Sequence, residues 1–440
     1  MGKSDSAVSL WLERLVNVES NEIRALLWSF LYFFFVLCSY YIIRPIRDEM
    51  GIAGGVEHLQ WLFTGTFLVM LAIVPVFGWI TSRFPRRQFL PYVYYFFMMN
   101  LLLFFLMFQS DLTHTYVARA FYIWASVFNL FVVSVFWSFM ADIFSNEQAK
   151  RLFAFIAAGG TAGALTGPLL TTTLVGTLGP TNLLLFSAGL LGCAVLCIKH
   201  LSQWQLNRTR SVQAASDVPH KTQTAEQEQS LKSGIWGGIQ LLVRSPYLMG
   251  ICLLMLLYTT LSTFLYFQQA HIIRDSFQDS ATRTAVFAGM DLVVNALTIL
   301  FQVFLTARIV KAVGIAWTLS IVPMMLVVGF LCLAIAPLLT VVVVLQVVRR
   351  AGNFAITRPA REMLYVVVSK DEKYKTKNFI DTAVYRGGDV VSAWAYTGLV
   401  GLGLSLAAIA AVAVPIAAIW AWVAFRLGRK QEQLALQQST

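Results

Sequence analysis

The sequence predicts an all-α membrane protein, a bundle of twelve transmembrane helices in two six-helix repeats. Three observations predict it: apolar runs of about 20 residues, one long polar interruption near the middle, and short motifs that return in the second half at nearly one offset. Hydrophobic residues make up 58% of the 440 residues and charged residues only 12%, which leaves no large polar domain. The chain is therefore predicted to lie almost entirely in a membrane.

Each apolar run is long enough to cross the hydrocarbon core of a bilayer as a helix. A β-barrel, the other structure that can span a bilayer, alternates apolar and polar residues, whereas Leu31–Leu37 and Val341–Val348 are nearly continuous apolar blocks. The sequence therefore argues against a barrel. The twelve predicted helices lie near residues 24–43, 56–80, 88–109, 115–140, 152–176, 181–199, 246–267, 285–306, 315–335, 337–357, 379–402 and 404–426.

Residues 1–23 precede the first predicted membrane helix. They lack a basic start, a short apolar stretch and a small-residue cleavage site, so no removed signal peptide is predicted. From Ala7 to Ile23, apolar residues such as Trp11 and Leu15 alternate with charged ones such as Glu13. This amphipathic pattern suits a helix that lies at the membrane surface, and it suits equally a helix packed on the protein.

The positive charges predict the orientation in the membrane. If both termini are cytoplasmic, about 25 of the 33 Lys and Arg residues lie on the cytoplasmic side, as the positive-inside rule requires. The predicted location is the inner (plasma) membrane, crossed many times, with both termini in the cytoplasm. The net charge of +11 then follows from topology, and nucleic acid is not predicted as a partner.

Neither the cysteines nor the histidines predict a metal or cofactor site. All five cysteines lie within apolar runs, where they behave as small hydrophobic residues. Cys193 and Cys197 share a helical face, but no His or carboxylate joins them to complete a metal-binding set. The five histidines are scattered near predicted loops. We expect no disulfide, no metal and no cofactor.

One polar segment divides the chain. Ser202–Lys232 is rich in Gln, Ser and Thr, with mixed charges and almost no large apolar residues, which is typical of a mobile linker. The predicted domains are the amphipathic segment 1–23, an N-terminal six-helix bundle 24–200, a cytoplasmic linker 201–245, a C-terminal six-helix bundle 246–426 and a tail 427–440.

The two predicted bundles are repeats of one another. Ile46-Arg47-Asp48 at the end of the first predicted helix returns as Ile273-Arg274-Asp275 at the end of the seventh, an offset of 227. The further matches are Thr81-Ser82-Arg83 with Thr306-Ala307-Arg308 and Glu147 and Lys150 with Glu372 and Lys375, both at 225, and Gly159-Gly160 with Gly387-Gly388 at 228. Parallel repeats of this kind bind a substrate between the halves at mid-membrane depth, and access alternates as the halves rock. The repeat therefore predicts a transporter.

Gly78–Arg87, between the second and third predicted helices, reads Gly-Trp-Ile-Thr-Ser-Arg-Phe-Pro-Arg-Arg. It resembles the Gly-x-x-x-Asp-Arg-x-Gly-Arg-Arg loop of the major facilitator superfamily, which implies that superfamily's fold. Ser82 stands where the family has an acid and Pro85 where it has a glycine, so the inter-helix charge interaction of the family does not carry over. The basic residues also fit simple topology anchors.

Three further regions resemble the nucleotide transporters of plastids and intracellular bacteria, the ATP/ADP translocases, a distant branch of that superfamily. The most specific is Arg361-Glu362-Met363-Leu364-Tyr365, followed by Lys373, Lys375, Lys377, Ile380-Asp381 and Arg386-Gly387-Gly388. In the family this region reads Lys/Arg-Glu-Met-x-Tyr, a Lys-x-Lys-x-Lys series, Ile-Asp and Arg-x-Gly. The other two regions are Ile43–Asp48 and Phe136–Asp142 with Glu147–Arg151. The resemblance implies transport of a nucleotide.

A phosphate-bearing substrate needs several cations that converge on one cavity, because burying its charge without partners is costly. Arg47, Lys375 and Lys377 occupy positions that the family uses for nucleotide recognition. The candidate substrate-binding residues are Arg44, Arg47, Arg274, Arg349, Arg350, Lys375, Lys377 and Arg386. The lysines fit equally a solvated positive cluster in a cytoplasmic loop, and the adjacent arginines at 349 and 350 fit either a cavity or a buried pair.

Acidic residues inside or next to the predicted helices are candidates for coupling or gating. They are Asp48, Asp142, Glu147, Asp291, Glu362, Asp381 and Asp389. Asp291 fits a proton or cation relay, or an internal pair with an arginine. Arg386 lies about one turn from both Asp381 and Asp389, so a structural ion pair and a ligand site both remain open.

The glycines at 159, 160, 163 and 167 predict close packing of the fifth helix against a neighbour. No phosphate-binding Gly-x-x-x-x-Gly-Lys-Ser/Thr loop is present, so transport is predicted to draw on gradients or exchange. The leading hypothesis is a monomeric secondary transporter of an anionic, phosphate-bearing solute in the lipid bilayer, with ATP/ADP exchange as one form. The alternative is a proton-coupled transporter of another organic anion or a metal chelate. An enzyme is not predicted, because no convergent His, Ser or paired acids can be assembled.

Overall fold

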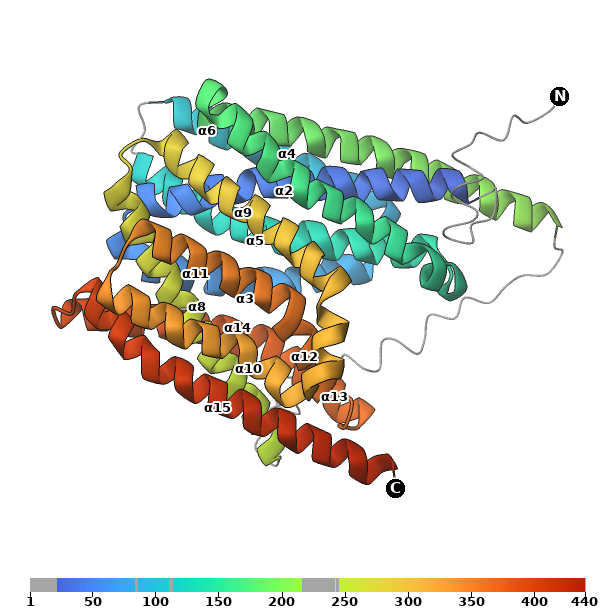
Figure 1. Cartoon of the computed structure of the whole chain (residues 1–440). Helices are drawn as coiled ribbons and strands as arrows, with labels where there is room; N and C mark the ends of the chain where they lie inside the picture. The colour runs from blue at the N-terminus through green and yellow to red at the C-terminus, as the bar shows by residue number, and fades with distance from the viewer. Residues whose placement is uncertain (1–21, 84–85, 111–113, 216–241, 243–244, 440) are drawn as a thin grey trace. The chain divides into compact units, whose positions relative to one another are not determined.

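The computed structural model describes the whole chain except residues 1–21, 84–85, 111–113, 216–241, 243–244 and 440 (Figure 1). The predicted amphipathic segment Ala7–Ile23 lies outside the described residues apart from its last two positions. Every regular element of the described part is a helix, which confirms the all-α prediction.

In the first sequence half, the helices are α2 (Ile23–Ala53), η1 (Val56–His58), α3 (Leu59–Arg83), α4 (Arg86–Gln109), α5 (His114–Ile143) and α6 (Asn146–Ala215). In the second half they are α8 (Pro246–Ser276), α9 (Ser280–Phe304), α10 (Thr306–Ile335), α11 (Leu339–Gly352), η3 (Asn353–Thr357), α12 (Arg358–Leu364), α13 (Lys370–Phe379), η4 (Ile380–Val384), α14 (Tyr385–Gly401) and α15 (Leu406–Ser439). The segments η3 and η4 are π-helical.

Ten of the described helices are long and apolar enough to cross a membrane. One of them, α6, contains two of the predicted helices, with the chain turning at Gly179, whose positive φ of 76° suits a residue without a Cβ. A further predicted helix corresponds to α14, which has 17 residues. The prediction of many membrane helices is confirmed, and the number twelve stays a prediction.

The helices preserve the sequence repeat. Both α2 and α8 have 31 residues, and each carries near its end an arginine that pairs with the next residue, Arg47 with Asp48 at 2.6 Å and Arg274 with Asp275 at 2.8 Å. Equivalent helices α6 and α13 each begin after a serine that caps the helix. Ser145 and Gln148 form a reciprocal capping box, in which the backbone N–H of Ser145 donates to the side chain of Gln148. At Ser369 the hydroxyl accepts from the backbone N–H of Glu372 and donates to its carboxylate.

Helix caps therefore align Gln148 with Glu372, one position away from the predicted match of Glu147 with Glu372. The reason is local: the third residue of a helix is the one whose side chain can reach back to the capping backbone N–H.

The described parts of the predicted linker and tail include helix. Helix α6 continues through Ser202 to Ala215, and α15 runs through the predicted tail to Ser439. The extension of α6 is packed rather than free, because Trp204 lies 6.2 Å from Phe144 and Gln205 donates a hydrogen bond to the carbonyl oxygen of Asp142. Good helix formers such as Gln and Leu support it.

The chain forms two compact units that do not coincide with the predicted halves 24–200 and 246–426. The first unit takes its residues from Met1–Gly54, Leu68–His220 and Asp279–Leu292, and the second from Gly55–Phe67, Lys221–Gln278 and Val293–Thr440. The first turns of α9 thus belong to the first unit, and the first turns of α3 to the second. The division follows the contacts within each unit and not the order of the helices in the sequence.

In the first unit, α2 lies directly against α6 (Figure 1). A Cβ at Gly159 would lie 2.4 Å from the carbonyl oxygen of Phe30, and a Cβ at Gly163 would lie 2.4 Å from that of Phe34. These distances leave no room for a side chain, so the glycines let two backbones touch. The predicted close packing at the glycines is confirmed.

The second unit packs α10 against α15 in a similar way (Figure 1). A Cβ at Gly428 would lie 2.3 Å from the Cα of Ala316. The contact between α8 and α14 combines a glycine with hydroxyl groups. A Cβ at Gly388 would lie 2.5 Å from Oγ1 of Thr259, and the hydroxyl of Ser392 donates to that of Thr260 at 3.0 Å. This polar contact positions the candidate site.

Candidate functional site

Arg349, near the end of α11, is a buried cation held by neutral groups. Its side chain reaches α8, where Nη1 donates to the hydroxyl of Ser262 at 2.6 Å, while Nε donates to Oε1 of Gln346 at 2.8 Å. Only 7% of the residue is exposed. Its hydrogen-bond partners, Gln346, Ser262 and Tyr258, are all neutral, and the carboxylate that interacts with it electrostatically is that of Asp389. Burying a guanidinium among neutral groups is costly, and a substrate anion bound there would offset that cost.

The α8–α14 contact surrounds that cation with further polar groups. The rings of Tyr258 and Tyr385 lie 6.1 Å apart, and the guanidinium of Arg386 stacks on Tyr385 at 5.6 Å. Asp389 lies 3.9 Å from Arg386 and accepts a hydrogen bond from Thr263 at 3.5 Å. The structure therefore brings together three predicted residues: Arg349, Arg386 and Asp389. Arg350, the next residue along α11, is also buried.

A second group of predicted residues lies in the first unit, on α2 and the first turns of α9. Arg44 pairs with Asp291 at 3.4 Å, which favours the internal pair over the relay among the two interpretations of Asp291. Arg47, already paired with Asp48, stacks on the ring of Tyr122 at 4.9 Å. Arginines held in this way can exchange a protein carboxylate for a substrate anion.

Arg274 does not join either group. It lies at the end of α8, about one third exposed, between Asp275 and Glu57. Its pair with Glu57 lies within the second unit and joins α8 to η1.

The charge-rich stretch from Arg358 to Asp389 pairs largely with itself. Lys377 donates to Glu362 at 2.6 Å, and Arg361 lies 3.3 Å from Asp381. Arg386 therefore lies near Asp389 while Asp381 pairs with Arg361, and the roles of these residues stay predictions. The backbone of Lys375 lies in α13, and its side chain is outside the described part of the structure.

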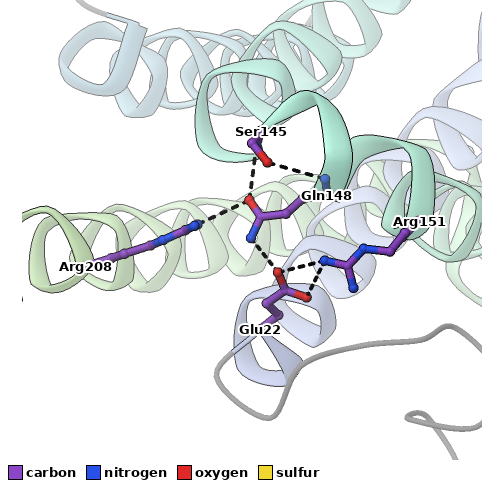
Figure 2. Close-up of polar contacts among 5 residues, drawn as sticks. All are labelled: Glu22, Ser145, Gln148, Arg151 and Arg208. Carbon is purple, nitrogen blue, oxygen red and sulfur yellow. Dashed lines mark hydrogen bonds and ion pairs between the residues drawn. The ribbon is translucent and has the colours of Figure 1, made fainter. Parts of the chain in front are cut away.

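Asp142 and Glu147 have exposed side chains, and the buried group beside them is Gln148 (Figure 2). Its amide donates to Glu22 at the start of α2, and its carbonyl accepts from Arg208 at 3.2 Å. Arg151 also lies 3.3 Å from Glu22. This cluster ties the start of α2 to both ends of α6. The Ser-x-x-Gln spacing at 145–148 was the sequence signal that could have identified it.

The sequence analysis also missed an ion pair between Glu49 and Arg283. The guanidinium binds both carboxylate oxygens at 2.7 Å, and Glu49 is fully buried. The start of α9 is fixed further by Asp279, whose pKa is lowered by hydrogen bonds from the backbone N–H and hydroxyl of Thr282. No short motif marks a pair 234 residues apart, so the sequence carried no local signal.

Replacing Glu49 with glutamine is expected to destabilise the protein by roughly 3 kcal/mol, because it breaks the bidentate ion pair that this fully buried carboxylate makes with Arg283. Thermal denaturation of the purified protein in detergent measures this loss. Glu57→Gln is the matched control: it breaks a pair whose carboxylate is 65% exposed, for which about 1 kcal/mol or less is expected. Equal shifts of the melting temperature for Glu49→Gln and Glu57→Gln would contradict the larger contribution assigned to the Glu49–Arg283 pair. The swap Glu49→Arg with Arg283→Glu should recover part of the loss.

The chain matches known proteins at three levels. The sequence profile described as Major Facilitator Superfamily matches residues 23–364. ADP,ATP carrier protein 1 of Chlamydia muridarum (strain MoPn / Nigg) is 20% identical over 84% of this chain and 81% of its own length. ADP,ATP carrier protein 1 of Chlamydia pneumoniae is 20% identical over 94% of this chain and 92% of its own. The resemblance to ATP/ADP translocases is therefore confirmed at the level of distant relatives.

Solved structures show the same fold. A bacterial homologue of the iron transporter ferroportin, in an inward-facing state, aligns with a TM-score of 0.64 and 12% identity over 93% of this chain and 98% of its own. The nucleoside transporter NupG aligns with a TM-score of 0.59 and 13% identity, again over 93% and 98%.

Proposed function

Because the chain belongs to the Major Facilitator Superfamily, and is thus a membrane transporter, we propose that it is a secondary active transporter of an anionic, phosphate-bearing solute. The observation that carries this proposal is Arg349, a buried guanidinium whose hydrogen bonds go to the neutral groups of Gln346 and Ser262. An ionised group inside a membrane helix bundle is costly, and it is retained where it binds substrate or ion. Arg386 adds a second cation, since both arginines interact electrostatically with Tyr385.

Nucleotides are the proposed solutes, and ATP/ADP exchange is the proposed mode. Two relatives over most of the chain are ADP,ATP carrier proteins. A nucleoside di- or triphosphate carries several oxyanions, and the planar guanidinium of an arginine binds two such oxygens at once. Arg44 and Arg47 on α2 supply cations in the first unit, and Arg349 and Arg386 supply cations in the second. Access to the site would alternate between the two sides of the membrane.

We further propose that the protein is a monomer of the inner membrane with both termini in the cytoplasm. Lys377 then lies on the cytoplasmic side. Lys377 pairs with Glu362 in this structure, and release of that pair would free it for a phosphate.

Counter-exchange in vesicles tests the function. Proteoliposomes preloaded with ADP are expected to take up labelled ATP at least about tenfold faster than empty ones, because a strict exchanger returns to the outer side only when loaded. The measurement is the initial rate of uptake at fixed outside concentration, with citrate inside the vesicles as the non-phosphate control. Equal rates with ADP, with citrate and with nothing inside would contradict exchange.

A second candidate is a proton-coupled transporter of another organic anion or a metal chelate. Asp389 favours it, since the contacts of this carboxylate with Arg386 at 3.9 Å and Thr263 at 3.5 Å are long, and a carboxylate in a membrane helix with such long contacts can exchange a proton. Uptake that follows an imposed pH gradient and ignores the anion inside the vesicles would favour this candidate over exchange.

A further inference from the structure

Two buried glutamines hold Arg349. Gln346, one turn before Arg349 on α11, accepts the hydrogen bond from its Nε and donates its own amide to Oε1 of Gln269 on α8. Gln346 is 2% exposed and Gln269 is 3% exposed. We call this chain of hydrogen bonds, from Gln269 through Gln346 to Arg349, the relay. Buried amide groups are costly in a membrane bundle unless they are hydrogen-bonded, so the relay also satisfies the side chain of Gln346.

The relay fixes which end of Gln346 faces the arginine. An amide has one accepting oxygen and one donating nitrogen. Because Gln269 accepts from the nitrogen, the oxygen of Gln346 is turned to Nε of Arg349. The guanidinium is thus oriented by an amide oxygen 2.8 Å from Nε. A carboxylate oxygen would lie at a similar distance, but the amide carries no negative charge.

A carboxylate at the same place would have the opposite consequence. Glutamate has the size and shape of glutamine, and at 2.8 Å its charge would form a strong ion pair with the guanidinium. Such an internal anion would satisfy the cation permanently and compete with any substrate anion.

We propose that Gln346, held by Gln269, is a positioning residue that orients Arg349 without neutralising it, and so keeps its charge for the oxyanion of a substrate. The inference rests on the proposed function only for the identity of the ligand. Its physical content, that the group orienting Arg349 is a neutral amide and not a carboxylate, can be tested without any substrate.

The substrate-free test is a double-mutant cycle in thermal stability. The four proteins are the wild type, Gln346→Glu, Arg349→Gln and the double variant, each purified in detergent. Gln346→Glu is expected to leave the melting temperature unchanged or raise it in the wild type, because the new carboxylate pairs with Arg349. In the Arg349→Gln background the same change is expected to lower it, because the carboxylate is then buried alone. Equal lowering in both backgrounds would overturn the inference.

The functional test uses labelled ADP in proteoliposomes. Gln346→Glu is expected to raise the KM for ADP at least about tenfold and to change the maximal rate much less. The new carboxylate competes with ADP for Arg349, whereas it does not hinder the conformational change that moves ADP across the membrane. Gln346→Leu, which introduces no charge, is expected to raise KM by about threefold to tenfold through loss of orientation. If Gln346→Glu does not fold, the KM of Gln346→Leu tests the positioning role of Gln346.

The matched control is Gln268→Glu. Gln268 is 1% exposed and lies next to Gln269 on α8, but its amide donates to the carbonyl oxygen of Leu406 rather than to the relay. The KM of this variant is expected to stay within about twofold of the wild type. An unchanged KM in Gln346→Glu, or an equal rise in both glutamate variants, would overturn the inference. A wild type that moves no ADP would overturn the proposed substrate instead, and the stability cycle would still decide the inference.

Discussion

Replacing Arg349 with glutamine is expected to reduce transport of the substrate anion at least about 100-fold in kcat/KM, because a charge-assisted contact in a buried site is worth roughly 3 kcal/mol. The same change should cost little stability. Arg349 is bonded to Gln346 and Ser262, both neutral, and Asp389, which interacts with it electrostatically, keeps its pair with Arg386. Transport is measured in proteoliposomes with labelled ADP, and folding is followed by thermal denaturation.

Arg349→Lys is the conservative variant. It keeps the charge but loses the planar group that reaches Gln346 and Ser262 together, so a smaller loss of about tenfold is expected. Transport by the glutamine variant at the wild-type rate would remove Arg349 from the site. Equal, complete loss in both variants, with lowered melting temperatures, would indicate a structural role instead.

Replacing Gly163 with leucine is expected to prevent folding, with a loss of more than about 3 kcal/mol. A Cβ at this position would lie 2.4 Å from the carbonyl oxygen of Phe34 and 2.9 Å from the backbone nitrogen of Cys38. Both are backbone atoms of α2, so no side chain can turn away to make room. The amount of monodisperse protein recovered in detergent, and its melting temperature, measure the effect.

Gly176→Leu is the matched control on the same helix. No atom lies within 4 Å of a Cβ built at Gly176, so a near-neutral effect of about 0.5 kcal/mol or less is expected for the same substitution. If both variants fold equally well, the α2–α6 contact is not as close as described. If neither folds, the loss at Gly163 reflects leucine in α6 in general rather than the contact.

The glycine contact shows how far sequence alone reaches. Gly159, Gly160, Gly163 and Gly167 recur on one stretch of one predicted helix, and that spacing was enough to predict a close neighbour. It could not say which helix the neighbour is, because any helix of the bundle can approach a strip of small residues. The structure assigns it to α2.

The charged residues show what the sequence leaves undetermined. Lys377 is predicted as a substrate ligand from a family motif, and that role stays a prediction; its partner in the structure is Glu362, because the turn after α12 brings α13 back beside it. Glu49 was not predicted at all, although it forms a bidentate, fully buried ion pair. Gln346 was not predicted either. A single amide residue inside an apolar run indicates no function by itself, and its partners, Gln269 and Arg349, are known only from the structure.

The sequence by itself determined that the chain is helical, lies in a membrane and repeats itself. These properties depend on the length of apolar runs and on local spacing, and a one-dimensional pattern records both. Only the tertiary structure decided which charges are satisfied. Arg44, Arg283 and Arg361 each have a carboxylate from a distant segment, whereas Arg349 is held by amide and hydroxyl groups. The difference arises because electrostatic neutralisation acts over a few ångströms of space, and chain folding sets those distances independently of sequence separation.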